Sequence, residues 1–259
     1  MRIASPGHAV FVVTMIVLGI LGLIKPDLTV VWQPIPKSVH GLAYLCAFIS
    51  AVSGIGLLLQ RTAAAAARVL LGYLLLWLLL WSVPGIFLSP TVTFWWAACK
   101  VAVMTAGTWV LYVWFAADWD KRRFGFLTGE NGLRIAKALY GLALLPFGLA
   151  QFLYLQHTAE LVPGWLPWHR FWAYFTGWAL IAAGASVLTG VYARLAAALA
   201  AFEIGLFLLL VWVPVVAAGS ANIFQWAETL VSWALTAAAW VVADSYRGTS
   251  WLAWSKRSH

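Results

Sequence analysis

Charged residues are scarce in this sequence. Asp, Glu, Lys and Arg together make up 9% of the 259 residues, against about a quarter in soluble globular domains. Hydrophobic residues make up 64%, and the mean hydropathy is +0.90. This composition excludes an ordinary soluble domain and predicts an integral membrane protein.

Cysteine is nearly absent, and so are the usual cofactor motifs. The two cysteines, Cys46 and Cys99, lie inside apolar stretches and form neither a CxxC nor a metal-ligand pattern. This excludes a disulfide framework. No pattern that would hold an iron–sulfur cluster, a flavin or a dinucleotide is present, and no pair of mid-helix histidines that would suit a haem. We therefore expect no metal site and no built-in cofactor.

The apolar residues fall into eight stretches, each about the 20 residues that a helix needs to cross a bilayer. The sequence therefore predicts an all-α membrane protein with eight transmembrane helices. We expect them at residues 8–24, 39–60, 67–88, 92–116, 134–155, 170–190, 193–214 and 222–243.

The second half of the chain resembles the first at an offset of about 130 residues, and such periodic self-similarity predicts a duplicated architecture. Because four helices is an even number, the two repeats would enter the membrane in the same direction. We expect a first repeat at 1–117, a cytoplasmic linker at 118–133, a second repeat at 134–246 and a basic tail at 247–259, forming a short interfacial helix. The matching pairs include Tyr44 and Tyr174, Gly54 and Gly184, Pro84 and Pro214, and Trp96 and Trp226.

The positive charges predict an orientation. Twelve Lys and Arg residues fall on one side of the expected membrane, and only Lys25, Lys37 and Arg170 fall on the other. Because short loops rich in Lys and Arg stay in the cytoplasm, we expect both termini there, in a prokaryotic plasma membrane. The sequence pI of 9.8 then reflects topology and anionic lipid headgroups, with the lipid bilayer and not nucleic acid as the partner.

A four-helix unit emerges from these features: a proline-rich outer loop after the first helix, glycine and small residues in the second, and a Val-Pro pair ending the third. It resembles the DoxX/DoxD-like family, most closely over residues 161–190 and 192–214. The resemblance implies two fused copies of the family's unit. It also implies other protein subunits as partners, since some relatives are subunits of thiosulfate:quinone oxidoreductases or partners of thiol-redox enzymes. No catalytic motif of the family can be carried over to this chain.

Three ionisable residues lie within the hydrocarbon, well away from the ends of the expected helices, where each costs about 2.5–3.5 kcal/mol to insert. Lys100 and Glu228 occupy near-equivalent places in the two repeats at similar depth, so an ion pair between them is geometrically plausible. Glu203 lies near the middle of the seventh helix. The pair either holds the two halves together or forms a proton or ligand site.

Helical spacing extends this pair into two stripes, because residues three or four apart share a helix face. An aromatic-walled pocket in the outer leaflet with a few polar groups would suit a quinone headgroup or a similar amphiphile. A packing interface satisfied internally is the alternative. The candidate ligand-binding residues are Trp96, Cys99 and Lys100 on the fourth helix and Gln225, Trp226 and Glu228 on the eighth.

Aromatic and basic residues gather at the outer boundary. Such side chains usually anchor helices at the headgroup level, and recognition of a headgroup or an anion is the alternative. The residues are His40 and Tyr44 on the second helix and His169, Arg170 and Tyr174 on the sixth.

Two functions of different classes remain open. The first is a membrane subunit of a thiol- or thiosulfate-quinone redox system that binds quinone or a related amphiphile in the outer leaflet. The second is a non-enzymatic carrier for a small apolar molecule, or a scaffold subunit of a larger membrane complex. The sequence leaves open whether the chain is an enzyme.

Overall fold

The structure is a computed structural model that describes residues 3–29, 40–88 and 91–254. Within these ranges it is all-α, without strands, and eight helical segments are long and apolar enough to cross a membrane. The predicted fold class and the number of spans are therefore confirmed. Multi-pass membrane insertion follows from this length and hydropathy.

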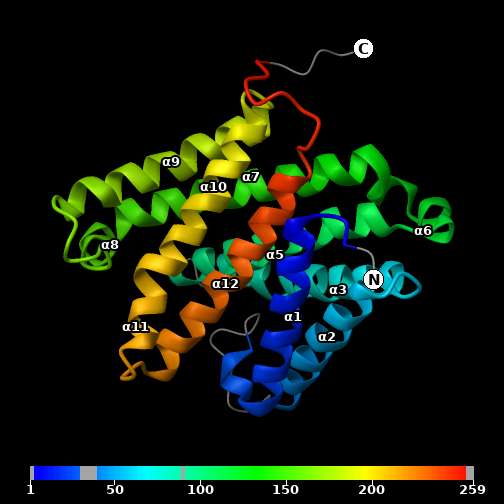
Figure 1. Cartoon of the computed structure of the whole chain (residues 1–259), viewed down its shortest axis with the longest axis horizontal. Helices are drawn as coiled ribbons and strands as arrows, with labels where there is room; N and C mark the ends of the chain where they lie inside the picture. Colours follow the sequence, from blue (N-terminus) through cyan, green and yellow to red (C-terminus); the bar gives the residue numbers. More distant parts are fainter. Residues whose placement is uncertain (1–2, 30–39, 89–90, 255–259) are drawn as a thin grey trace.

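Four of the eight spans come from each half of the chain, and Figure 1 shows how they are arranged. The first half contains α1 (Pro6–Ile24), α2 (His40–Leu58), α3 (Ala63–Trp77) with its continuation α4 (Val83–Leu88), and α5 (Val92–Phe115). A short helix, α6 (Asp118–Arg123), follows. The second half contains α7 (Gly129–Leu153), the short α8 (Leu155–Glu160), α9 (His169–Thr189), α10 (Ala193–Phe207) with its continuation α11 (Val213–Ala217), and α12 (Ile223–Asp244).

The helices of the two halves pack in the same order. In the first half α1 packs on α2, α2 on α3 and α3 on α5; in the second α7 packs on α9, α9 on α10 and α10 on α12. Across the halves, α5 packs on α12, α1 on α12 and α7 on α5. The first helix of each half thus lies against the last helix of the other half. The repeat arrangement itself stays a prediction.

Both third spans contain a π-helical segment followed by Val-Pro. Leu78–Ser82 precedes Val83 and Pro84, and Leu208–Trp212 precedes Val213 and Pro214. Proline lacks an N–H and clashes with the carbonyl four residues earlier, and a locally wider turn relieves that clash. The Val-Pro pairs therefore do not end these helices, as the sequence suggested, but lie inside them.

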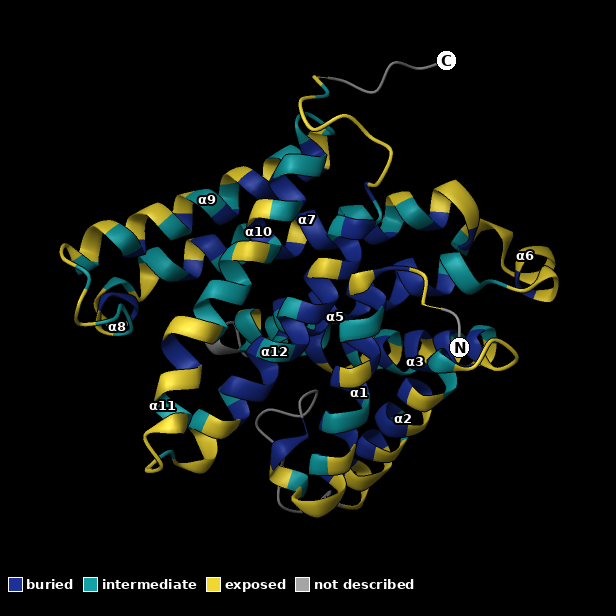
Figure 2. Cartoon of the chain, viewed as in Figure 1, coloured by how far each residue is buried: buried dark blue, intermediate teal, exposed yellow. Residues whose placement is uncertain are grey.

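The helices approach closely at the centre, where α5 and α12 are the most buried spans. A Cβ on Gly107 of α5 would lie 2.8 Å from the carbonyl oxygen of Ala238 on α12. Small residues let helices approach in a bilayer because lipid gives no hydrophobic drive to association. By contrast, α9 and α11 expose much of their surface (Figure 2).

Two ends of the bundle can be distinguished. The terminal end carries α6, the start of α1 and the end of α12, and the far end carries α8, α11 and the start of α12 (Figure 1). At the terminal end the backbone N–H of Gly7 donates to Oδ2 of Asp244 at 2.8 Å. This bond fixes the start of the chain to its last helix.

A second carboxylate, Asp120 of α6, organises the terminal end of the first half. Arg68 of α3 donates from Nε to Oδ1 at 2.6 Å and from Nη2 to Oδ2 at 2.9 Å. The Tyr112 hydroxyl and the Ala117 backbone N–H donate to the same carboxylate at 3.1 and 3.0 Å. The guanidinium also lies 4.6 Å from the ring centroid of Trp119. Asp120 therefore joins α3, α5 and α6.

Two sequence expectations at this end are wrong. Helix α7 begins at Gly129, five residues before its expected start, and Arg134 pairs with Glu130 across its first turn at 3.3 Å. The described part of the tail, up to Trp254, forms turns in place of an interfacial helix. Its backbone is held by Arg194, which donates to the Thr249 carbonyl at 2.6 Å, so a tertiary contact replaces helical hydrogen bonding.

Candidate functional site

The ion pair expected from the sequence is present at the far end of the bundle. Lys100 Nζ on α5 lies 2.7 Å from Oε1 and 2.9 Å from Oε2 of Glu228 on α12. The two side chains are 17% and 15% exposed. The pair therefore connects the last helices of the two halves and is largely, but not completely, enclosed.

Aromatic rings flank the pair on one side. Trp96 lies one turn before Lys100 on α5, and Lys100 Nζ is 5.5 Å from its ring centroid. Tyr154, the residue after α7, stacks on Trp96 with centroids 6.2 Å apart and an interplanar angle of 14°. We call Trp96, Lys100, Tyr154 and Glu228 the far-end cluster. Sequence reasoning missed Tyr154, because no spacing in the chain relates it to α5.

Gln225 has a different role from the one its spacing suggested. Its Oε1 accepts from the backbone N–H of Asn222 at 2.9 Å, while Oδ1 of Asn222 accepts from the backbone N–H of Gln225 at 2.9 Å. This reciprocal capping box satisfies N–H groups that have no helical partner at the start of α12. The hydrogen bonds described for the Gln225 side chain therefore belong to the helix cap.

The other candidate ligand residues lie near the cluster along the chain but differ in environment. Cys99 is buried, as is Cys46, and the two do not form a disulfide bond. Trp226 is 41% exposed, which suits a side chain facing lipid. Only Trp96, Lys100 and Glu228 of the six predicted residues are thus joined by described contacts.

The expected interface residues lie at the starts of α2 and α9. Tyr44 and Tyr174 are exposed, and Tyr174 packs on Phe152 with ring centroids 5.8 Å apart. Arg170 is exposed and His169 half-buried. The side chain of His40 lies outside the described residues. Exposed aromatic and basic side chains at helix starts match the anchoring interpretation.

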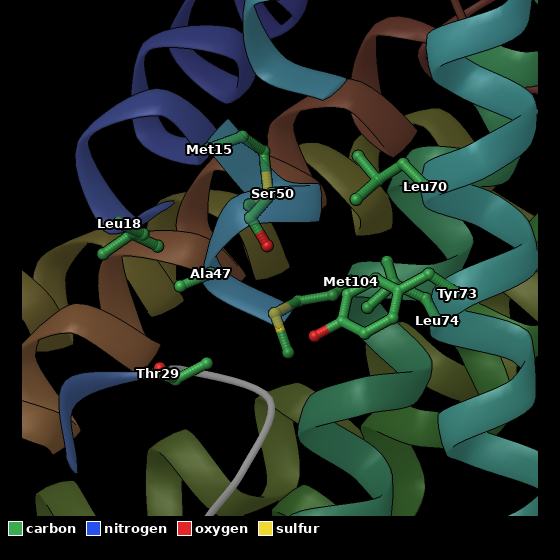
Figure 3. Close-up of a pocket in the computed structure, with 9 residues that line it drawn as sticks. All are labelled: Met15, Leu18, Thr29, Ala47, Ser50, Leu70, Tyr73, Leu74 and Met104. Carbon is green, nitrogen blue, oxygen red and sulfur yellow. The ribbon is translucent and has the colours of Figure 1, made fainter. Parts of the chain in front are cut away.

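A small cavity lies elsewhere, between α1, α2, α3 and α5 (Figure 3). Its volume is about 20 Å³, enough for a water molecule and far below the several hundred Å³ of a typical ligand pocket. The Tyr73 ring lies beside Met104, across from Ser50 and Thr29. Thr29 Oγ1 is buried without a hydrogen-bond partner.

The third intramembrane ionisable residue, Glu203, lies on α10 and is not joined to the far-end cluster by any described contact. Its Oε1 is buried without a hydrogen-bond partner. In the part of the chain that the structure describes, no group of three or more His, Cys, Asp or Glu residues is placed to hold a metal ion. Comparison with protein families, curated proteins and solved structures finds no match to this chain.

Proposed function

We propose that the chain is a non-catalytic membrane module, a scaffold subunit, whose halves are locked together inside the bilayer by the far-end cluster. The observation that carries this is the Lys100–Glu228 pair, in which one ammonium meets both carboxylate oxygens. The ring of Trp96 covers a further side of the ammonium. The two charges of the cluster are therefore paired within the protein, as a structural contact inside a membrane requires.

The energetics favour a structural role for such a pair. A single charge in the hydrocarbon is expensive, so each partner is tolerated because the other is present. Removing one partner of a buried pair costs about 3–5 kcal/mol because it strands the other charge, whereas replacing both can be nearly neutral. At 17% and 15% exposure, we expect values at the lower end of that range.

A double-mutant cycle tests this role, with Lys100→Met, Glu228→Gln and the double variant compared by thermal unfolding in mild detergent. We expect each single change to lower the melting temperature, and the double variant to lose much less than the sum. A cycle on the exposed pair Glu130 and Arg134, whose side chains are 89% and 61% exposed, serves as the control and should show almost no coupling. Additive losses at Lys100 and Glu228 would contradict the proposal.

A second candidate function is that of a DoxX-like redox subunit that binds a quinone-type amphiphile. The observation that favours it is the Trp96–Tyr154 stack beside a partly exposed ion pair. A quinone ring can stack on such a face, and a Lys ammonium can donate to its carbonyl oxygen. In this proposal the protein lies in a prokaryotic plasma membrane with its termini in the cytoplasm, and its cluster lies in the outer leaflet.

Titration with a short-chain quinone distinguishes the two candidates. The purified chain in detergent is mixed with the quinone, and binding is followed by equilibrium dialysis. If the redox candidate holds, Trp96→Ala weakens binding, while Trp165→Ala, at a residue 71% exposed, leaves it unchanged. Equal partition of quinone into wild-type and Trp96→Ala samples would leave only the scaffold proposal.

A further inference from the structure

Glu203 is a carboxylic side chain in the middle of a membrane span. It lies ten residues after the first residue of α10, about 15 Å along the helix, and the span of α10 and α11 covers 25 residues. One carboxyl oxygen, Oε1, is buried without a hydrogen-bond partner. This placement contrasts with that of Glu228, which has Lys100 against both oxygens.

The elements packed against α10 supply no charge at this level. Helix α9 has no ionisable residue between Tyr174 and Thr189, and α12 has none between Glu228 and Asp244. Glu228 is paired with Lys100, and Asp244 with Arg247 at 2.9 Å. Arg194, the other ionisable residue of α10, donates to Thr249 at the terminal end.

One phenol among the described residues lies within electrostatic range of Glu203. Tyr140 of α7 is fully buried, its hydroxyl has no hydrogen-bond partner, and it interacts electrostatically with both Glu203 and Tyr246. Tyr246 in turn lies under Lys137, whose Nζ is 3.7 Å from the ring centroid.

An ionised carboxylate is not stable in such surroundings. Without a cation or donors, burial of the charge in a low dielectric costs far more than protonation does, so the group takes up a proton. A neutral acid has one O–H and retains acceptor capacity. Oε1 is enclosed by protein, whereas the Glu203 residue as a whole is only half-buried.

We propose that Glu203 is a proton-binding site inside the membrane, a carboxylic acid that holds its proton in the folded protein. The observation that carries this proposal is the burial of Oε1 in the middle of a span without a hydrogen-bond partner.

Dicyclohexylcarbodiimide tests this site, because it is apolar and reacts with protonated carboxyls. The acid proton moves to a carbodiimide nitrogen, the carboxyl oxygen bonds to the carbodiimide carbon, and rearrangement gives a stable N-acylurea that retains every atom of both reactants. The full chain in mild detergent at neutral pH is treated and mapped by peptide mass spectrometry. We expect an adduct on Glu203 that is lost as the pH rises, with none on Glu228 or the exposed Glu130.

Two variants make the result decisive. Glu203→Gln should abolish the adduct on this helix, and Lys100→Met should create one on Glu228 by removing its cation. An unlabelled Glu203 alongside a labelled Glu228 in Lys100→Met would overturn the proposal. Infrared spectroscopy gives an independent measurement: wild type should show the carbonyl band of a protonated carboxylic acid, and Glu203→Gln should lack it. Absence of that difference would likewise overturn the proposal.

Discussion

Replacing Asp120 by Asn should weaken the terminal end of the first half. The carboxylate accepts four hydrogen bonds, two from Arg68 and one each from Tyr112 and Ala117. An Asn side chain offers one acceptor oxygen, and its NH₂ would face a donor that now meets a carboxylate oxygen. The substitution therefore removes the charge and at least one hydrogen bond while keeping the volume.

The expected cost follows from the exposure of the two partners. Asp120 is fully buried, but the side chain of Arg68 is 38% exposed, so water hydrates the guanidinium when its partner is lost. Breaking a fully buried pair costs about 3–5 kcal/mol, and a hydrogen bond to a charged group contributes about 1.5–3 kcal/mol. We therefore expect a loss of about 2–3 kcal/mol in the free energy of unfolding, because solvation of Arg68 offsets part of the full penalty.

The effect should depend on pH. Burial alone would raise the pKa of Asp120, but hydrogen bonds from Arg68, Ala117 and Tyr112 outweigh burial and hold the pKa below its ordinary value. A lowered folded-state pKa contributes stability that is complete above the unfolded-state pKa and is lost as the pH falls through the folded-state pKa. The difference between wild type and Asp120→Asn should be largest at neutral pH and should shrink below about pH 4.

Thermal unfolding in mild detergent over this pH range measures the effect. Asp118→Asn is the matched control: it lies on the same short helix and pairs with Lys121 at 3.6 Å, but the two side chains are 86% and 60% exposed. Its stability should stay within about 0.5 kcal/mol of wild type. Equal melting temperatures for Asp120→Asn and Asp118→Asn at neutral pH would refute the assigned role of Asp120.

Two further predictions concern packing and topology. Gly107→Ala should lower stability by about 1–3 kcal/mol, because the new Cβ meets the backbone of Ala238. Gly72→Ala is the control and should be tolerated, because a Cβ there has nothing within 4 Å. Equal melting temperatures for the two variants would contradict the tight α5–α12 contact. In a chain with Cys46 and Cys99 replaced by Ser, Arg122→Cys should react with an impermeant maleimide in inverted vesicles but not in intact cells, since the charge distribution predicts a cytoplasmic α6. Strong labelling in intact cells would reverse the orientation.

The number and order of the spans were predictable because each span is long and apolar. The first and last residues of the helices were harder to predict, because tertiary contacts decide them. Residues 118–133 were expected to form a linker, yet α7 already begins at Gly129, and Gly132 packs against the Leu127 carbonyl too closely for a Cβ. In the tail, Arg194 holds the Thr249 carbonyl, a contact over 55 residues that no local pattern predicts.

The far-end cluster was partly predictable for a related reason. Lys100 and Glu228 have opposite charges at similar expected depth, and an unpaired charge in the hydrocarbon is expensive. Their pairing could therefore be predicted from the sequence. Gln225 was misassigned because a capping box and a polar stripe share the same three-residue spacing. Tyr154 and Asp120 depend on how distant helices cross, which the one-dimensional sequence does not specify.

The two membrane glutamates show that the partner, and not the residue type, decides the chemistry. Glu228 is paired with the ammonium of Lys100, whereas Glu203 has a buried oxygen without a hydrogen-bond partner and, in our proposal, holds a proton. Glutamine has the shape of a protonated glutamate and carries no charge. It therefore replaces the native state of Glu203 but removes that of Glu228 and leaves Lys100 unpaired. The same Glu-to-Gln change should accordingly be mild on α10 and costly on α12, a contrast that no difference in helix propensity or side-chain volume would produce.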